Sequence, residues 1–129
     1  MTTQGKSLEE LGRRAVGCKH WRWMPGMLHG IEAMDEMRYV SRFSEFSIYA
    51  DDDGRIPILS DPATLGCLLH LVREAHEDAD IVAFVVHSHG SPEKWCVDVG
   101  PAPDFHDERK YVYRPTEAEA LVAALEAAP

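Results

Sequence analysis

The clearest pattern of apolar and polar positions along this chain lies between residues 60 and 75. Asp61 is a favoured helix N-cap, and Pro62 suits the first helical position, because the N–H that proline lacks would have no partner there. Four apolar residues then recur at the i, i+3, i+4, i+7 spacing of one helix face: Leu65, Leu68, Leu69 and Val72. The pattern predicts a buried helix over about residues 61–77.

Shorter patterns predict one more helix near each end of the chain. Two pairs have the Ser/Thr-x-x-Glu spacing of a capping box, Ser7 with Glu10 and Thr116 with Glu119. The apolar faces that follow are Leu8, Leu11 and Ala15 in the first segment, and Ala118, Leu121, Val122 and Leu125 in the second. We therefore expect helices over about residues 7–16 and 116–127.

Segments rich in β-branched and aromatic residues predict the strands. The first pair covers residues 37–42 and 45–50, the second covers 81–88 and 94–99, and a short fifth strand covers 111–114. Residues 28–36 are ambiguous and fit a short turn. The resulting order, α-β-β-α-β-β-(β)-α, predicts an α+β fold: a single compact domain over 1–129, with a mainly antiparallel sheet and helices packed on one face.

The second strand pair carries the sharpest chemical hypothesis. A four-residue loop at 90–93 predicts that His87 lies opposite Cys96 and His89 opposite Lys94, with Val86 opposite Val97. The apolar face would then hold Phe84, Val86, Trp95, Val97 and Val99, and the other face would hold His87, His89, Cys96 and Asp98. Two imidazoles, a thiolate and a carboxylate form a plausible zinc set. The alternative is a solvated strand face that is rich in histidine.

The same histidines resemble another metal site. The stretch Val-Val-His-Ser-His at residues 85–89 is similar to the His-x-His strand of JAMM-type metal isopeptidases. That resemblance implies a metal-dependent hydrolase. The Ser-x-x-Asp that follows in the family is absent, since Val97 and Gly100 occupy its places, and only Glu45 stands as a candidate for the upstream glutamate. We expect no catalytic residues from the sequence and keep this enzyme as an alternative.

The charge of the chain limits its partners. The formal net charge is −9, so duplex DNA should be repelled, whereas a basic protein surface or a basic groove that normally holds nucleic acid should attract it. The expected partner-binding residues are acidic and lie in turns or on a polar helix side: Asp51, Asp52, Asp53, Glu74, Glu77, Asp78, Asp80, Asp104, Asp107 and Glu108. The alternative is that the charge serves solubility alone.

Compartment and cofactors follow from a few residue types. The three cysteines are odd in number and widely spaced, which favours reduced thiols over disulfides. The sequence has no apolar run long enough to cross a membrane, and the first 20 residues lack the apolar core of a signal peptide. We expect a cytoplasmic protein without a membrane partner and without a cofactor, zinc being the alternative.

An aromatic and methionine-rich segment runs from Trp21 to Met37. Its large apolar side chains are Trp21, Trp23, Met24, Met27, Met34 and Met37. Such side chains serve both protein cores and adaptable binding surfaces, and because large apolar residues are normally buried, we favour the core.

Three segments resemble small proteins encoded by tailed bacteriophages and prophages. They are Trp-Arg-Trp-Met-Pro-Gly-Met at 21–27, the helix segment 59–75, and the closing stretch 116–129 that begins Thr-Glu-Ala-Glu-Ala-Leu-Val. The resemblance implies a phage accessory protein in a bacterial host cell. Such proteins often bind host machinery without acting as enzymes, including as inhibitors of defence systems such as CRISPR complexes. A structural or assembly role is a further alternative.

Overall fold

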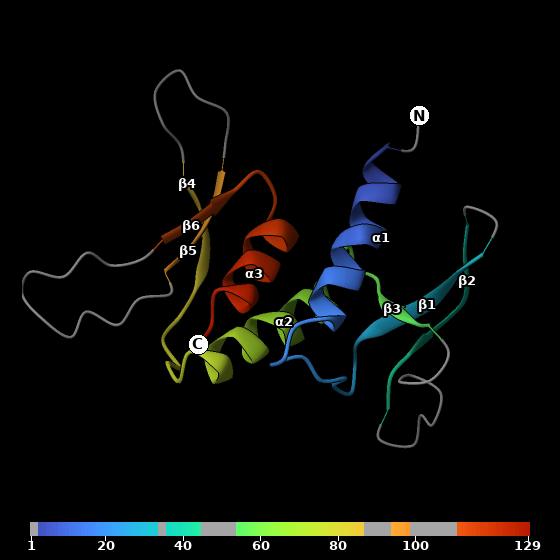
Figure 1. Cartoon of the computed structure of the whole chain (residues 1–129), viewed down its shortest axis with the longest axis horizontal. Coiled ribbons are helices and arrows are strands. Elements are labelled where there is room, and N and C mark those ends of the chain that lie inside the picture. Colours follow the sequence, from blue (N-terminus) through green and yellow to red (C-terminus); the bar gives the residue numbers. More distant parts are fainter. Residues whose placement is uncertain (1–2, 34–35, 45–53, 87–93, 99–110) are drawn as a thin grey trace, which may run out of the picture. The chain divides into compact units, whose positions relative to one another are not determined.

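A computed structural model of the chain describes residues 3–33, 36–44, 54–86, 94–98 and 111–129. Three helices and six strands occur in these residues (Figure 1), in the order α1 (Thr3–Val16), β1 (Leu28–Ala33), β2 (Glu36–Arg42), β3 (Ile56–Pro57), α2 (Pro62–Ala75), β4 (Ala83–Val86), β5 (Lys94–Asp98), β6 (Tyr111–Arg114) and α3 (Glu117–Glu126). All strand pairs are antiparallel. The α+β class is confirmed.

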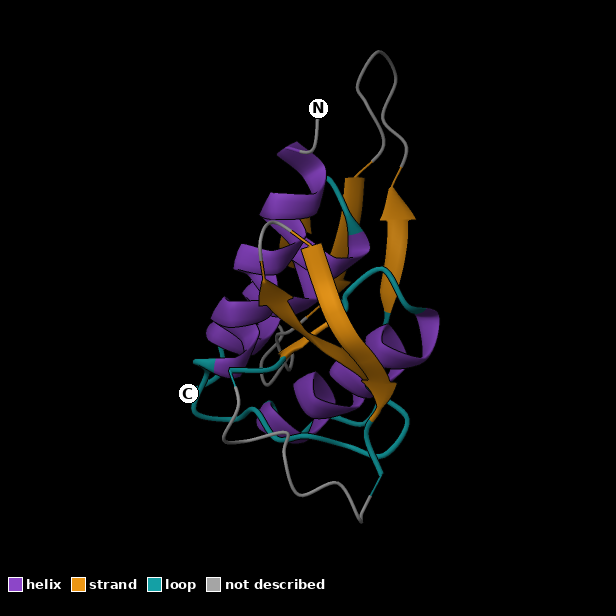
Figure 2. Cartoon of the chain, turned by 90° about the vertical axis from the view of Figure 1, so that its right-hand side faces the viewer, coloured by secondary structure: helices purple, strands orange, loops and turns teal. Residues whose placement is uncertain are grey.

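The chain divides into two compact units, residues 1–67 and 68–129, and the division falls within α2. The first unit has a sheet of order β2-β1-β3, and α1 contacts β3. The second has a sheet of order β4-β5-β6, and α3 contacts all three of its strands (Figure 1). Figure 2 shows the strands in orange and the helices in purple from a second direction. The strands thus form two sheets where we expected one. That the chain is a single domain stays a prediction.

Helix α1 begins at Thr3, so the expected start at Ser7 is wrong. Ser7 lies inside the helix and cannot serve as its N-cap. The residues before it include Gln4 and Lys6, which are good helix formers, and a helix that has begun extends readily through a serine. Helix α1 ends at Val16, directly before Gly17. The Gly17 N–H donates to the Arg13 carbonyl oxygen at 3.0 Å and so closes the last turn.

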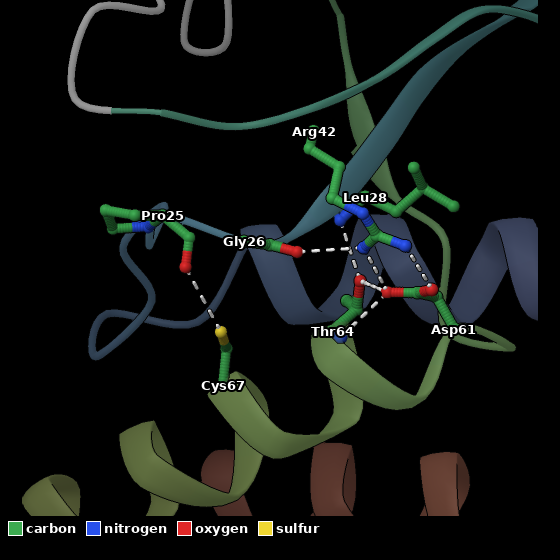
Figure 3. Close-up of polar contacts among 7 residues, drawn as sticks. All are labelled: Pro25, Gly26, Leu28, Arg42, Asp61, Thr64 and Cys67. Carbon is green, nitrogen blue, oxygen red and sulfur yellow. Dashed lines mark hydrogen bonds and ion pairs between the residues drawn. The ribbon is translucent and has the colours of Figure 1, made fainter.

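The start of α2 is held by the carboxylate of Asp61 (Figure 3). Its Oδ2 accepts from the Thr64 backbone N–H at 3.0 Å and from the Thr64 hydroxyl at 2.9 Å, which confirms Asp61 as the N-cap. The Thr64 Oγ1 in turn accepts from the Leu28 N–H at 2.8 Å. Two side chains of the α2 start therefore satisfy backbone donors on both the helix and β1.

Arg42 of β2 completes this network. Its Nη1 donates to Asp61 Oδ2 at 2.7 Å and its Nη2 donates to Asp61 Oδ1 at 2.9 Å, while Nη1 also donates to the Gly26 carbonyl oxygen at 3.0 Å. The Arg42 hydrogen bond, together with those of Thr64, holds the pKa of the Asp61 carboxyl well below its usual value, although burial opposes this. The ion pair joins the end of β2 to the start of α2.

The β1–β2 pair contains a bulge at Gly30. The register changes between His29 and Ile31, so Gly30 faces both Tyr39 and Val40. Tyr39 has a φ of 55°, which is strained for a side chain of this size. A Cβ on Gly30 would lie 2.8 Å from the Met37 side chain and 3.1 Å from the Arg38 carbonyl oxygen, so a larger residue would force the Met37 side chain to move. Of the expected strands nearby, 37–42 corresponds to β2, whereas 45–50 lies outside the described residues.

Strands β1 and β3 were not expected. Residues 28–36, which fitted a short turn, contain β1 and the start of β2. The sequence Leu-His-Gly-Ile-Glu-Ala lacks a regular alternation, and its glycine weakens the strand signal. Strand β3 has two residues, which is too short for a pattern.

Helix α3 begins as predicted, with the Thr116 Oγ1 accepting from the Glu119 N–H at 3.2 Å. It is more buried than one face requires, because seven of its ten residues are buried. At its end, the Nε2 of His76 lies 2.7 Å from the Ala124 carbonyl oxygen. Since a carbonyl oxygen can only accept, His76 donates this bond and caps an oxygen of the last helical turn.

The residues expected at the centre of the core are buried. Leu68, Leu121 and Val97 each have 0% exposure, which confirms this part of the sequence analysis. Leu65 and Leu69, expected on the buried face of α2, are only half-buried, and Leu71 is buried instead.

We expect Leu68→Ala to lower the free energy of unfolding by about 2–5 kcal/mol, because the substitution leaves a cavity where the side chain is fully buried. Leu69→Ala on the same helix is the matched control and should cost clearly less, since Leu69 is half-buried. Urea unfolding of both variants measures the difference. Equal losses would contradict the burial of Leu68.

We also expect Thr64→Val to destabilise the chain by about 1–3 kcal/mol, although valine has nearly the same shape. The substitution leaves the Leu28 N–H without its acceptor and removes one donor from Asp61. Hydrogen exchange of the Leu28 amide should accelerate in the variant. A variant as stable as the parent, with an unchanged Leu28 exchange rate, would contradict the role given to this hydroxyl.

Candidate functional site

The register of the second sheet decides which side chains share a face. Val86 pairs with Lys94, and Phe84 pairs with Cys96. The expected pairing of Val86 with Val97 and of His87 with Cys96 is therefore wrong, by three residues. The described strands end at Val86 and resume at Lys94, and the expected four-residue loop at 90–93 lies outside the described residues.

An odd shift in register moves every side chain of one strand to the opposite face relative to its partner strand. Phe84 and Val86 consequently share a face with Cys96, and not with Trp95 and Val97 as expected. The expected polar face around Cys96 is instead partly aromatic. Val99, the last member of the expected apolar face, lies outside the described residues.

The expected zinc ligands are only partly described. His87 and His89 lie outside the described residues, so zinc binding stays a prediction without the pairing on which it rested. The described part of the chain contains no group of three or more His, Cys, Asp or Glu side chains placed to hold a metal ion. Burial raises the pKa of the Cys96 thiol, a hydrogen bond with the Tyr113 side chain opposes this shift, and the Asp98 carboxylate adds to it. The net effect disfavours the reactive thiolate form in the absence of a metal ion.

An exposed aromatic face takes the place of the expected polar one. Phe84, Cys96 and Tyr113 lie directly opposite one another across β4, β5 and β6. Tyr111 lies opposite Asp98, two residues further along, so it shares the face of Tyr113. The exposed fractions are 40% for Phe84, 43% for Tyr111 and 47% for Tyr113. The two tyrosine rings lie 6.0 Å apart at 35°. We call these three side chains the aromatic face.

The opposite side of this sheet is covered. Helix α3 packs on the sheet (Figure 1), and Val97, which points away from the aromatic face, is fully buried. Cys96 is only 1% exposed although it belongs to the aromatic face, because Phe84 and Tyr113 flank it from both neighbouring strands. The sheet thus has one face on which the central residue Val97 is buried and one face on which large aromatic rings meet solvent, as expected of an interaction site.

Four of the expected acidic partner-binding residues are described: Glu74, Glu77, Asp78 and Asp80. The turn that ends α2 brings them together. The Glu77 N–H donates to the Glu74 backbone carbonyl oxygen at 3.1 Å, and the Asp78 N–H donates to the Arg73 backbone carbonyl oxygen at 2.9 Å. With Glu77 at a φ of 53°, these two bonds form a Schellman motif. Glu77 and Asp80 are exposed. Glu74 also pairs with His70 at 3.2 Å.

This acidic turn and the aromatic face belong to the same unit. Ile81 and Val82 lead from the turn into β4, whose first residue pairs with Val97. The turn therefore enters the sheet at the end where Asp98 pairs with Tyr111. The other expected acidic residues, Asp51, Asp52, Asp53, Asp104, Asp107 and Glu108, lie outside the described residues.

The aromatic segment of the first unit is partly core. Met27 is fully buried, whereas Trp21, Trp23 and Met24 are half-buried. The Trp23 ring packs edge-on against Trp21 and His29, both with centroids at 5.3 Å, and stacks with Phe43 at 6.0 Å. Met34 lies outside the described residues. The choice of core over interface is confirmed for Met27.

His29 is the buried titratable group of this cluster. Its side chain is 3% exposed, and Arg55 Nη1 lies 3.1 Å from its Nδ1. Since a guanidinium can only donate, Nδ1 accepts and the neutral ring carries its proton on Nε2. Burial, and then the charge of Arg55, lower the pKa of His29 below its ordinary value of 6.5. The same Nη1 donates to the Tyr39 carbonyl oxygen at 3.0 Å, so a neutral His29 supports the arginine that holds the bulge.

Comparison with known proteins adds no relative: no family model, no curated protein and no solved structure matches the chain. Among the described helices, none is long and apolar enough to cross a membrane.

Sequence reasoning missed the aromatic face because it placed Phe84 in the core. One signal was available, the spacing of Tyr111 and Tyr113, which puts both rings on one face of a strand. What the sequence could not give was the register, and the register alone decides that Phe84 joins them.

We expect acid to destabilise the chain through His29. Because folding lowers its pKa, the neutral ring stabilises the folded state fully above about pH 6.5, and this contribution is lost as the pH falls through the lowered pKa. Urea unfolding followed by tryptophan fluorescence between about pH 7.5 and 5.5 measures the loss. His29→Gln should reduce this pH dependence, whereas the exposed control His70→Gln should keep it. An unchanged pH dependence in His29→Gln would contradict the assignment.

Proposed function

We propose that this chain is a phage-type accessory protein that acts in the bacterial cytoplasm, without catalysis, by binding a host protein. The observation that carries the proposal is the aromatic face, which is exposed on a sheet whose three strands contact α3. The resemblance of three segments to phage and prophage proteins supports the biological setting. Inhibition of a defence complex, as anti-CRISPR proteins achieve, is the form of action that we propose for it.

The chemistry of this surface favours a partner that presents arginine or lysine among apolar side chains. Aromatic rings attract such cations through their faces. Asp98 lies opposite Tyr111, and the acidic turn at Glu77 and Asp80 enters the sheet at the same end. The net charge of −9 adds long-range attraction for a basic surface and repels free nucleic acid. A protein, or the protein part of a ribonucleoprotein complex, therefore fits better than duplex DNA.

The rings should supply the affinity and the acidic turn the speed of association. Buried aromatic side chains dominate many interfaces, whereas exposed charges mainly change the association rate and its salt dependence. The two contributions can therefore be separated by experiment.

The test is affinity capture from a bacterial lysate with three immobilised baits: the parent chain, the double variant Phe84→Ser/Tyr113→Ser, and Arg114→Gln. Arg114 is exposed and neighbours Tyr113 on the same strand, but it points to the other face, so it is a matched control. We expect at least one protein that the parent and Arg114→Gln baits retain and the double variant loses. Identification by mass spectrometry then allows the purified partner to be measured.

With that purified partner, the association rate should fall as salt rises from about 0.05 to 0.5 M, because exposed charges are screened over short distances. Glu77→Lys/Asp80→Lys should slow association more than it speeds dissociation. Circular dichroism establishes that each bait is folded. Equal capture by folded parent and double-variant baits, or capture of nucleic acid alone, would contradict the proposal.

A further inference from the structure

A second apolar site lies in the first unit. A pocket of about 190 Å³, half open to solvent, is lined by side chains of α1, of β2 and of the segment from Pro57 to Ser60. The apolar lining residues are Leu8, Met37, Val40, Pro57, Ile58 and Leu59. Every lining residue belongs to the first unit, and none belongs to the aromatic face. We call it the α1–β2 pocket.

Its volume sets the size of what can enter. An apolar cavity of about 150 Å³ is large enough to bind benzene, so the α1–β2 pocket has room for about one aromatic or large aliphatic group. Met37 lines it, and a flexible thioether side chain can adapt to groups of different shape. Two of the lining residues, Pro57 and Leu59, are buried.

The bulge in β2 shapes the rim of this pocket. Val40 lines the pocket and is 48% exposed, and Tyr39, next to it in the chain, is 73% exposed in a strained conformation. Arg55 holds the Tyr39 carbonyl oxygen at 3.0 Å, which keeps the strained bulge in place. Gly30 allows the Met37 side chain to lie over β1, where a Cβ would displace it. A second exposed apolar side chain, Tyr39, therefore adjoins the lining residue Val40 along the chain.

The charge at the pocket is of one sign. Glu9 is the one ionisable residue among those that line it, and Ser60 is the one hydroxyl. A ligand that fills the apolar volume and places a cation at Glu9 would satisfy both features. The acidic charge of the whole chain favours the same sign of ligand.

We propose that the α1–β2 pocket binds a short peptide segment of a partner protein, in which one large apolar side chain enters the pocket and an adjacent lysine or arginine pairs with Glu9. A peptide suits the site because the pocket offers an apolar volume for one side chain and a carboxylate, Glu9, for a cationic neighbour, with Tyr39 as a further exposed apolar side chain beside Val40. This site is separate from the aromatic face, and it stands or falls independently of it.

The test uses three blocked dipeptides, acetyl-Phe-Lys-amide, acetyl-Phe-Glu-amide and acetyl-Ala-Lys-amide, titrated into the methyl-labelled full chain and followed by NMR. We expect acetyl-Phe-Lys-amide to shift the methyl signals of Leu8, Val40 and Ile58 with millimolar affinity. Acetyl-Phe-Glu-amide should bind about two- to fivefold more weakly, which is the size of an exposed ion pair. Acetyl-Ala-Lys-amide should cause no saturable shift.

Charge reversal gives the decisive comparison. Glu9→Lys should invert the preference, so that acetyl-Phe-Glu-amide binds more tightly than acetyl-Phe-Lys-amide, and Val40→Lys should weaken the binding of both. Tyr113→Ser in the other unit is the matched control and should change neither. Unchanged amide spectra away from the substitution establish that each variant is folded. Equal binding of the two phenylalanine peptides to the parent chain, an unchanged preference in Glu9→Lys, or shifts confined to residues 68–129 would overturn the proposal.

Discussion

The first unit depends on the carboxylate of Asp61. Its oxygens accept hydrogen bonds from Thr64 at the start of α2 and from Arg42 at the end of β2. The Thr64 hydroxyl in turn accepts from the Leu28 N–H of β1. Three elements are thereby fixed relative to one another by hydrogen bonds to one side chain and its neighbour (Figure 3). Arg42 keeps this carboxyl ionised, so its hydrogen bonds to Asp61 are charge-assisted and directional. They anchor the end of β2, the strand that carries the bulge and lines the α1–β2 pocket.

Local signals in the sequence predicted the parts of the fold that local physics decides. The N-caps Asp61 and Thr116 and the buried residues Leu68 and Leu121 all follow from spacing within one segment. Strand register does not, because it depends on pairing across the sheet. A three-residue error there placed Phe84 on the wrong face, so we expected this ring in the core and not beside Cys96 and Tyr113.

The same limit applies to the first unit. The residues around Gly30 do not predict the positive φ of Tyr39. They also do not predict the hydrogen bond from Arg55 to the Tyr39 carbonyl oxygen. The exposed apolar surface of the first unit lies at a bulge, and that of the second depends on strand register; both are decided by pairing between strands. Each lies in its own unit and combines large apolar side chains with nearby carboxylates. A protein partner with basic and apolar side chains suits both surfaces for the same physical reason.

The most direct test of the central claim concerns the aromatic face in the free protein. A soluble gadolinium chelate relaxes the ring protons of side chains that meet solvent. We predict strong relaxation for Phe84, Tyr111 and Tyr113, and weak relaxation for the methyl groups of Val97 on the opposite face of the same sheet. If the three rings are instead as protected as Val97 in the monomeric chain, then the aromatic face is part of the core and cannot be the surface that binds a partner.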